Sequence, residues 1–264
     1  MRKQLAVAFA AALLISGCGS SGDSGGSGAT PASNSSSSGV TGPLNVFAAA
    51  SLTESFGKIG KDFEAANPGT TVTFNFAGSS ALATQINQGA PADVFASAAP
   101  ANMKTVTDKG NAEGTPTTFV KNQLVIAVAK GNPKGIKGLS DLANPDIKVA
   151  LCAPQVPCGA AANKALAAAN VKVTPVTLEQ DVKAALSKVR LGSVDAALVY
   201  RTDAKAAAAD VDAVEFPESS AAINEYPIVV LKNAANKAAA QAFVAYVLSN
   251  AGKTVLTEAG FQSP

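Results

Sequence analysis

From residue 44 onwards, apolar and polar positions follow two alternating patterns. Short runs of apolar and β-branched residues, typical of buried strands, cover residues 44–48, 71–76, 92–96, 124–129, 148–151, 196–200 and 228–231, and 171–176 forms a further extended segment. Between them, apolar residues recur every three or four positions over residues 51–66, 81–88, 159–169, from 180–182 onwards, and 238–248. This second spacing is typical of helices that pack one face against a core.

Strands separated by helices predict mostly parallel sheets covered by helices on both faces, which is an α/β fold. In such folds ligands bind beyond the carboxyl ends of the strands, where helices begin. Three of the predicted turns from strand to helix consist largely of small residues, at 49–51, 77–80 and 156–159, and a fourth helix begins near Val182. These four helix starts are therefore the candidate binding site.

A helix N-terminus offers unpaired N–H groups and a partial positive charge, which together suit an anion. Each helix start also has an ordinary structural interpretation. Ser51 followed by Glu54 forms a capping box, and Ser79 or Ser80 can cap the next helix. At the fourth start, a capping box over 177–180 competes with Asp181 as the N-cap.

The first seventeen residues have the pattern of a secretory leader. A basic start at 1–3 precedes an apolar run over 5–15, which is too short to span a bilayer as a helix. The sequence 14–18 resembles a bacterial lipobox, in which Cys18 becomes the lipidated first residue. We therefore expect a lipoprotein signal peptide at 1–17, with an ordinary signal peptide and an incidental cysteine as the alternative.

Residues 18–43 follow as the lipidated cysteine and a segment rich in glycine and serine. Such a composition buries too little apolar surface to offset its conformational entropy, so we expect a flexible tether. Its position directly after Cys18 fits a folded body held near a membrane surface.

The composition excludes much chemistry. The 264 residues include no histidine, so Ser-His-Asp and Cys-His nucleophiles and histidine-containing zinc sites are impossible, and three cysteines cannot form a four-cysteine site. The net charge is +2, and it falls to zero when the leader is removed with Arg2 and Lys3, which disfavours a nucleic-acid binder. A Ser-Lys hydrolase remains an alternative, although no Gly-x-Ser-x-Gly elbow is present. Composition therefore favours binding over catalysis.

Several motifs, in order along 44–264, resemble the molybdate-binding proteins of bacterial ABC importers. They are VFAAASLT at 46–53, GAPADVFASA at 89–98, PQVPCG at 154–159, EQDV at 179–182, ALVY at 197–200 and EYPI at 225–228. The resemblance implies a two-lobe periplasmic-binding-protein fold of type II, with each lobe a mostly parallel sheet flanked by helices. Lobe 1 is then 44–122 plus 227–264 and lobe 2 is 123–226, with 123–129 and 226–231 crossing between them as the hinge.

The same resemblance implies that a tetrahedral oxyanion, molybdate or tungstate, is bound between the lobes. Its ligands are implied to be the hydroxyls of Ser51, Ser79 (or Ser80 instead) and Tyr200 and the backbone amides of Cys158 and Val182, with alanine commoner than cysteine at 158. It further implies a monomeric binding protein, not an enzyme, without a cofactor or a directly bound metal cation. The protein would work on the outer face of the cytoplasmic membrane, with an importer permease and ATPase as partners.

The chemistry of these residues agrees with that implication. Serine, tyrosine and amide groups can all donate hydrogen bonds and bring no formal charge. A fully deprotonated dianion such as molybdate, tungstate or sulfate needs only donors, whereas protonated phosphate also needs an acceptor. Asp181 and Glu54 lie near two helix starts and could supply one, although complementing the helix dipole is their ordinary role. Sulfate or another small anion therefore remains the main alternative ligand, and a structural surface lipoprotein without a ligand is a third possibility.

Cys152 and Cys158 flank a short turn, and outside the membrane a disulfide between them is chemically reasonable. It would stiffen the turn that presents the Cys158 amide. Two free thiols are the alternative, and the spacing fits neither a redox motif nor a metal site.

Overall fold

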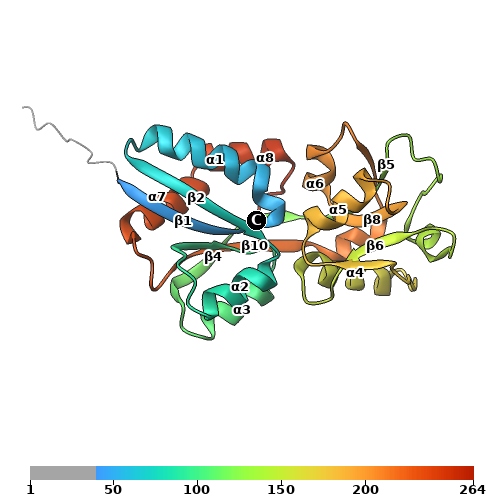
Figure 1. Ribbon diagram of the computed structural model, residues 1–264, viewed down its shortest axis with the longest axis horizontal. Coiled ribbons are helices and arrows are strands. Elements are labelled where there is room, and N and C mark those ends of the chain that lie inside the picture. The colour runs from blue at the N-terminus through green and yellow to red at the C-terminus, as the bar shows by residue number, and fades with distance from the viewer. Residues whose placement is uncertain (1–39) are drawn as a thin grey trace, which may run out of the picture. The chain divides into compact units, whose positions relative to one another are not determined.

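The computed structural model describes residues 40–264, which form two lobes, each built on a five-stranded sheet (Figure 1). The predicted leader at 1–17, the lipidation site at Cys18 and the tether up to residue 39 lie outside the described residues. Gly42 and Pro43, predicted as tether, are instead the first residues of a strand.

The first lobe contains a sheet with the strand order β2-β1-β3-β10-β4. The strands are β1 (Gly42–Ala49), β2 (Thr70–Ala77), β3 (Val94–Ala96), β4 (Ala112–Asn122) and β10 (Asn224–Leu231). β1 pairs in parallel with both β2 and β3, whereas β10 is antiparallel to β3 and β4. Four strands therefore point the same way, and β10 runs against them.

Helices cover both faces of this first sheet, as its sequence pattern predicts. α1 (Thr53–Ala66), α7 (Lys237–Leu248) and α8 (Asn250–Ala259) lie on one face, and α2 (Ser79–Asn87) and α3 (Pro100–Thr107) lie on the other (Figure 1). Successive residues of β1 point to opposite faces of the sheet and pack into two different hydrophobic cores. Val46 packs against α1 and α7 on one face, and Phe47 packs against α2 and α3 on the other. This alternation follows from the two-residue period of a strand.

The second lobe repeats the plan with the strand order β7-β6-β8-β5-β9. Its strands are β5 (Leu124–Ala129), β6 (Val149–Cys152), β7 (Thr177–Glu179), β8 (Ala196–Tyr200) and β9 (Val211–Val214), and its helices are α4 (Pro157–Ala168), α5 (Val182–Arg190) and α6 (Arg201–Ala206). Here β5 is the single reversed strand, antiparallel to β8 and β9. The chain enters this lobe between β4 and β5 and returns through a 3-10 turn, η3 (Pro217–Ala222), into β10.

Some predicted elements are shifted and others were not anticipated. The extended segment expected at 171–176 is irregular, and the strand lies just after it as β7, so the capping box proposed over 177–180 is wrong. Asp181 is the N-cap of α5, where its carboxylate accepts a hydrogen bond from the Ala184 N–H at 2.8 Å. The pattern did not predict α3, α6, α8, β4 or β9.

Candidate functional site

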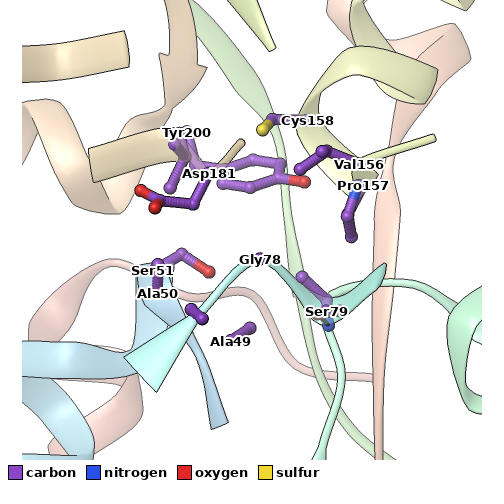
Figure 2. A pocket seen from close by; sticks show the side chains of 13 residues that line it. Ala49, Ala50, Ser51, Gly78, Ser79, Val156, Pro157, Cys158, Asp181 and Tyr200 are labelled. Atoms are coloured by element: carbon purple, nitrogen blue, oxygen red, sulfur yellow. Dashed lines mark hydrogen bonds between the residues drawn. The ribbon is translucent and has the colours of Figure 1, made fainter. Parts of the chain in front are cut away.

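A small cavity lies where the four predicted helix starts meet. Its volume is about 10 Å³, which is the space that one water molecule needs. Ser51, Ser79, Cys158, Val182 and Tyr200 all line it, and Ser80 does not. The remaining lining residues are Ala49, Ala50, Ala77, Gly78, Ala98, Val156, Pro157 and Asp181. The serines lie on one wall, and Tyr200 and Cys158 lie on the other (Figure 2).

Ser51 belongs to a 3-10 turn, η1 (Ala50–Leu52), between β1 and α1, and is buried at 4% exposure. The capping box predicted for it is wrong, because no side chain caps η1 or α1. Its hydroxyl is instead 2.9 Å from the hydroxyl of Tyr226 on β10. The 3-10 turn ends in α1, so the Ser51 hydroxyl is held at a helix start by a partner distant in the sequence.

Ser79 is the first residue of α2 and is also buried. Its hydroxyl accepts a hydrogen bond from the Ala98 N–H at 2.9 Å, so its proton is free to be donated into the cavity. Neither Ser79 nor Ser80 caps the helix, because the N-cap is Gly78. Ser80 is only partly buried and lies outside the cavity lining.

Gly78 lies at the cavity, where the two lobes approach each other closely. A Cβ atom added to Gly78 would be 2.2 Å from the carbonyl oxygen of Gln180, which lies in the second lobe just before α5. The φ of Gly78 is −60°, a value open to any residue, so the need for glycine is purely one of space. The small residues of this turn thus allow the two walls to meet.

The second wall presents the first turns of α4 and α5. Pro157 is the first residue of α4 and Cys158 follows it; Val182 is the first residue of α5. N–H groups in the first turn of a helix have no partner within that helix, so both amides are available as donors. The structure contains the Cys152–Cys158 disulfide, with Cα atoms 5.7 Å apart, which joins the end of β6 to the start of α4.

Tyr200 ends β8 and is 1% exposed, yet no group among residues 40–264 hydrogen-bonds its hydroxyl. Figure 2 shows this hydroxyl beside Val156 and Pro157, across the cavity from the two serines. Burial raises the pKa of the Tyr200 hydroxyl well above its usual value of 10, so it keeps its proton and can donate. A buried hydroxyl without a partner normally indicates that its partner is a ligand or water.

The cavity lining contains no lysine or arginine, and Asp181 is its only charged residue. The Asp181 carboxylate already accepts a bond from α5 as its cap. The site therefore presents hydroxyl and amide donors, which fits an anion that carries no proton.

Among residues 40–264, no cluster of three or more His, Cys, Asp or Glu side chains could hold a metal cation. Within that same range, no helix has the length and apolar character needed to cross a membrane.

Beside the cavity, an ion-pair cluster links the two lobes. Lys183 on α5 contacts Glu54 on α1 at 2.7 Å and Asp203 on α6 at 3.0 Å. Asp203 is fully buried, and burial raises its pKa to about 6 although the nearby Lys183 opposes the shift. Burial lowers the pKa of Lys183, but the attraction of Asp203 and Glu54 outweighs it, so the net shift is upward.

Three residues near the site were not assigned a role from the sequence: Tyr226, Asn122 and Lys183. Tyr226 lies in the EYPI motif, which was quoted only as part of a resemblance, and its contact with Ser51 joins residues 175 positions apart. Lys183 follows the predicted ligand Val182 directly, and this adjacency was the only signal for it.

Comparisons with known proteins show the family of the chain. Residues 44–262 match the family model described as "Bacterial extracellular solute-binding protein". The molybdate-binding protein ModA of Mycobacterium tuberculosis H37Rv is 48% identical over 219 residues, which are 83% of this chain and 84% of that protein.

Two solved structures share the two-lobe fold, as the sequence predicted. The substrate-binding domain of a putative molybdenum ABC transporter from Clostridium difficile is 30% identical, with a TM-score of 0.63 over 84% of this chain and 99% of that one. The sulfate-binding protein SubI from Mycobacterium tuberculosis H37Rv has a TM-score of 0.70 at 19% identity, over 84% of this chain and 86% of that one, so its likeness is one of fold alone.

Proposed function

The chain belongs to the bacterial extracellular solute-binding proteins, and we propose that it captures molybdate, and tungstate as well, between its two lobes for an ABC importer. The observation that carries this proposal is the buried Tyr200 hydroxyl, which has no hydrogen-bond partner among residues 40–264 and lines the cavity that the four helix starts share. The 48% identity to a molybdate-binding protein supports the choice of ion.

In this proposal five groups bind the oxyanion. Ser51, Ser79 and Tyr200 donate their hydroxyl protons, and Cys158 and Val182 donate their backbone N–H groups. All five line one cavity, and Ser79, rather than Ser80, is the serine of α2 that lies in it. The dipoles of the helix starts offset the negative charge, so the site needs no lysine or arginine.

Binding joins the lobes, because Ser51 and Ser79 belong to the first lobe and the other three groups to the second. With the bounds of the sheets, lobe 1 comprises 42–122 plus 224–264 and lobe 2 comprises 123–223, so the second crossing lies a few residues before the predicted one, and the two crossings act as the hinge. An anion that contacts both lobes favours the closed form over an open one by its additional contacts.

The rest of the proposal concerns location and partners. The leader at 1–17 directs the chain out of the cytoplasm, Cys18 carries the lipid, and 18–43 tethers the body to the outer face of the membrane. The protein acts as a monomer and delivers its ion to the permease, with an ATPase driving import. A putative substrate-binding lipoprotein among the relatives, from Bacillus subtilis at 33% identity, supports the anchor.

Calorimetry of the purified chain against molybdate, tungstate, sulfate and phosphate tests the choice of ion. We expect tight binding of molybdate and tungstate with weak sulfate and no phosphate binding. At a ligand concentration a thousandfold above Kd, molybdate should stabilise the fold by about 4 kcal/mol. If the protein prefers sulfate, the proposed ligand is wrong, and the same fold binds the smaller ion instead. If none of the four anions binds or stabilises the fold, the proposed binding function is refuted.

A matched pair of variants tests the site. Ser79→Ala removes a donor from the cavity, whereas Ser80→Ala removes a hydroxyl one residue away and outside it. We expect Ser79→Ala to weaken molybdate binding by at least about tenfold, because the donor bonds to a charged group, and Ser80→Ala to leave it unchanged. The reverse result would move the contact to Ser80.

A further inference from the structure

A chain of buried hydrogen bonds extends from Ser51 through Tyr226 and Asn122 to Thr202. The Ser51 hydroxyl is 2.9 Å from the Tyr226 hydroxyl, which in turn lies 3.4 Å from Nδ2 of Asn122. Asn122 Nδ2 also donates to Thr202 Oγ1 on α6 at 2.8 Å. Ser51, Asn122, Thr202 and Tyr226 are each at most 4% exposed, so solvent does not compete for these bonds.

The direction of donation along this chain is fixed at its far end. The backbone N–H of Gln123 donates to Asn122 Oδ1 at 2.9 Å, and a backbone N–H can only donate. Asn122 Oδ1 is therefore the acceptor of that side chain, and its Nδ2 is the donor. Tyr226 must accept from Asn122, and its own proton then needs an acceptor of its own.

Ser51 Oγ is the acceptor that lies within reach of that proton. If Ser51 donated to Tyr226 instead, Tyr226 would accept twice, and its own O–H would make no hydrogen bond that the structure of residues 40–264 contains, which is unfavourable in a fully buried position. Burial also raises the pKa of Tyr226, so it does not give up the proton as an ion. The Ser51 proton is thereby released to point into the cavity.

We propose that Tyr226 is a positioning residue for the anion site: held as an acceptor by Asn122, it donates to Ser51 and makes the Ser51 hydroxyl an obligate donor toward the bound oxyanion. A hydroxyl that already accepts a hydrogen bond donates more strongly, because bonds in a chain polarise one another. A hydroxyl locked in this way also disfavours an anion that brings its own proton, so Tyr226 contributes to the rejection of hydrogen phosphate.

This inference rests on the proposed function, since it requires Ser51 to touch the ligand. The test is a double-mutant cycle, in which calorimetry measures the Kd for molybdate of the wild type, Tyr226→Phe, Ser51→Ala and the double variant. Tyr246→Phe is the matched control, because Tyr246 on α7 lies outside the cavity lining. Thermal unfolding of each ligand-free variant shows that it is folded.

We expect Tyr226→Phe to weaken molybdate binding by about tenfold in the wild type and by less than about twofold in the Ser51→Ala background, since it acts only through Ser51. The ratio of phosphate to molybdate affinity should rise in Tyr226→Phe. If Tyr226→Phe unfolds the protein, Asn122→Ala serves in its place, and its effect should likewise vanish in the Ser51→Ala background.

Equal weakening in both backgrounds would make Tyr226 merely structural and overturn the inference, as would unchanged affinity and selectivity in Tyr226→Phe. Neither result would touch the proposed function, which fails only if the wild type binds none of the oxyanions. If the Ser51→Ala variant binds molybdate as tightly as the wild type, Ser51 does not contact the ligand, and the proposed positioning role of Tyr226 is refuted as well.

Discussion

Replacing Tyr200 by phenylalanine removes a single oxygen atom from the cavity wall. Tyr200 makes no hydrogen bond through its hydroxyl within residues 40–264, so the substitution breaks no bond inside the described part of the protein. Its ring packs edge-on against Tyr226 with centroids 6.0 Å apart, and phenylalanine retains that contact. The ligand-free protein should therefore keep its stability within about 1 kcal/mol, or about 2–4 °C in its thermal midpoint.

The ligand complex should respond quite differently. A hydrogen bond to a charged group contributes about 1.5–3 kcal/mol, which corresponds to about a 10- to 150-fold change in Kd. Because burial keeps the hydroxyl protonated, the loss should be the same across the neutral pH range. Tyr200→Phe thus separates a ligand contact from a structural one, since affinity falls while stability holds.

The assay combines calorimetry with molybdate and thermal unfolding without it, and Tyr246→Phe is the control for the loss of a tyrosine hydroxyl elsewhere. Unchanged affinity in Tyr200→Phe would refute the assignment of this hydroxyl as a ligand. A large loss of ligand-free stability would show that the hydroxyl has a structural partner.

Three further substitutions test other features. Gly78→Ala places a Cβ against the Gln180 carbonyl and should weaken molybdate binding at least about fivefold, whereas Gly57→Ala, with nothing within 4 Å of the added atom, should not; calorimetry decides. Replacing both disulfide cysteines by alanine should lower the free energy of unfolding by about 2 kcal/mol, measured by denaturant titration, and an unchanged midpoint would contradict this. Asp203 has its pKa raised from 3.8 to about 6 by burial against the pull of Lys183, so the folded state binds the proton more tightly than the unfolded chain. Wild type should therefore lose about 2 kcal/mol relative to Asp203→Asn as the pH rises from 4 to 7, and a pH-independent difference would refute the shift.

Local patterns predicted those features that depend on local contacts. The Asp181 cap is one, because its partner Ala184 is three residues away. The buried strands β5 and β8 were predicted with their observed bounds, since continuous apolar runs mark them. Helix α8 was missed although Ser249 caps it, because it follows α7 almost without a break.

Features set by distant partners could not be predicted in this way. Ser51 has the spacing of a capping box, but its hydroxyl bonds to Tyr226 far along the chain, and the helix begins with a 3-10 turn. β4 contains Gly114 and Pro116, has β10 as its one neighbouring strand in the described sheet and lies at the sheet edge, so it lacks the apolar run of a buried strand. The resemblance supplied the list of site residues, and only the fold showed them gathered around one cavity.

The close approach of Gly78 to Gln180 also has a consequence for rates. The cavity is lined mainly by buried residues of both lobes, so we expect a bound ion to leave readily only when the lobes separate. Dissociation can then be no faster than the separation of the lobes, whichever ion is bound. Residence time becomes a property of the hinge, and a permease that pulls the lobes apart would speed release without weakening a single contact to the ion.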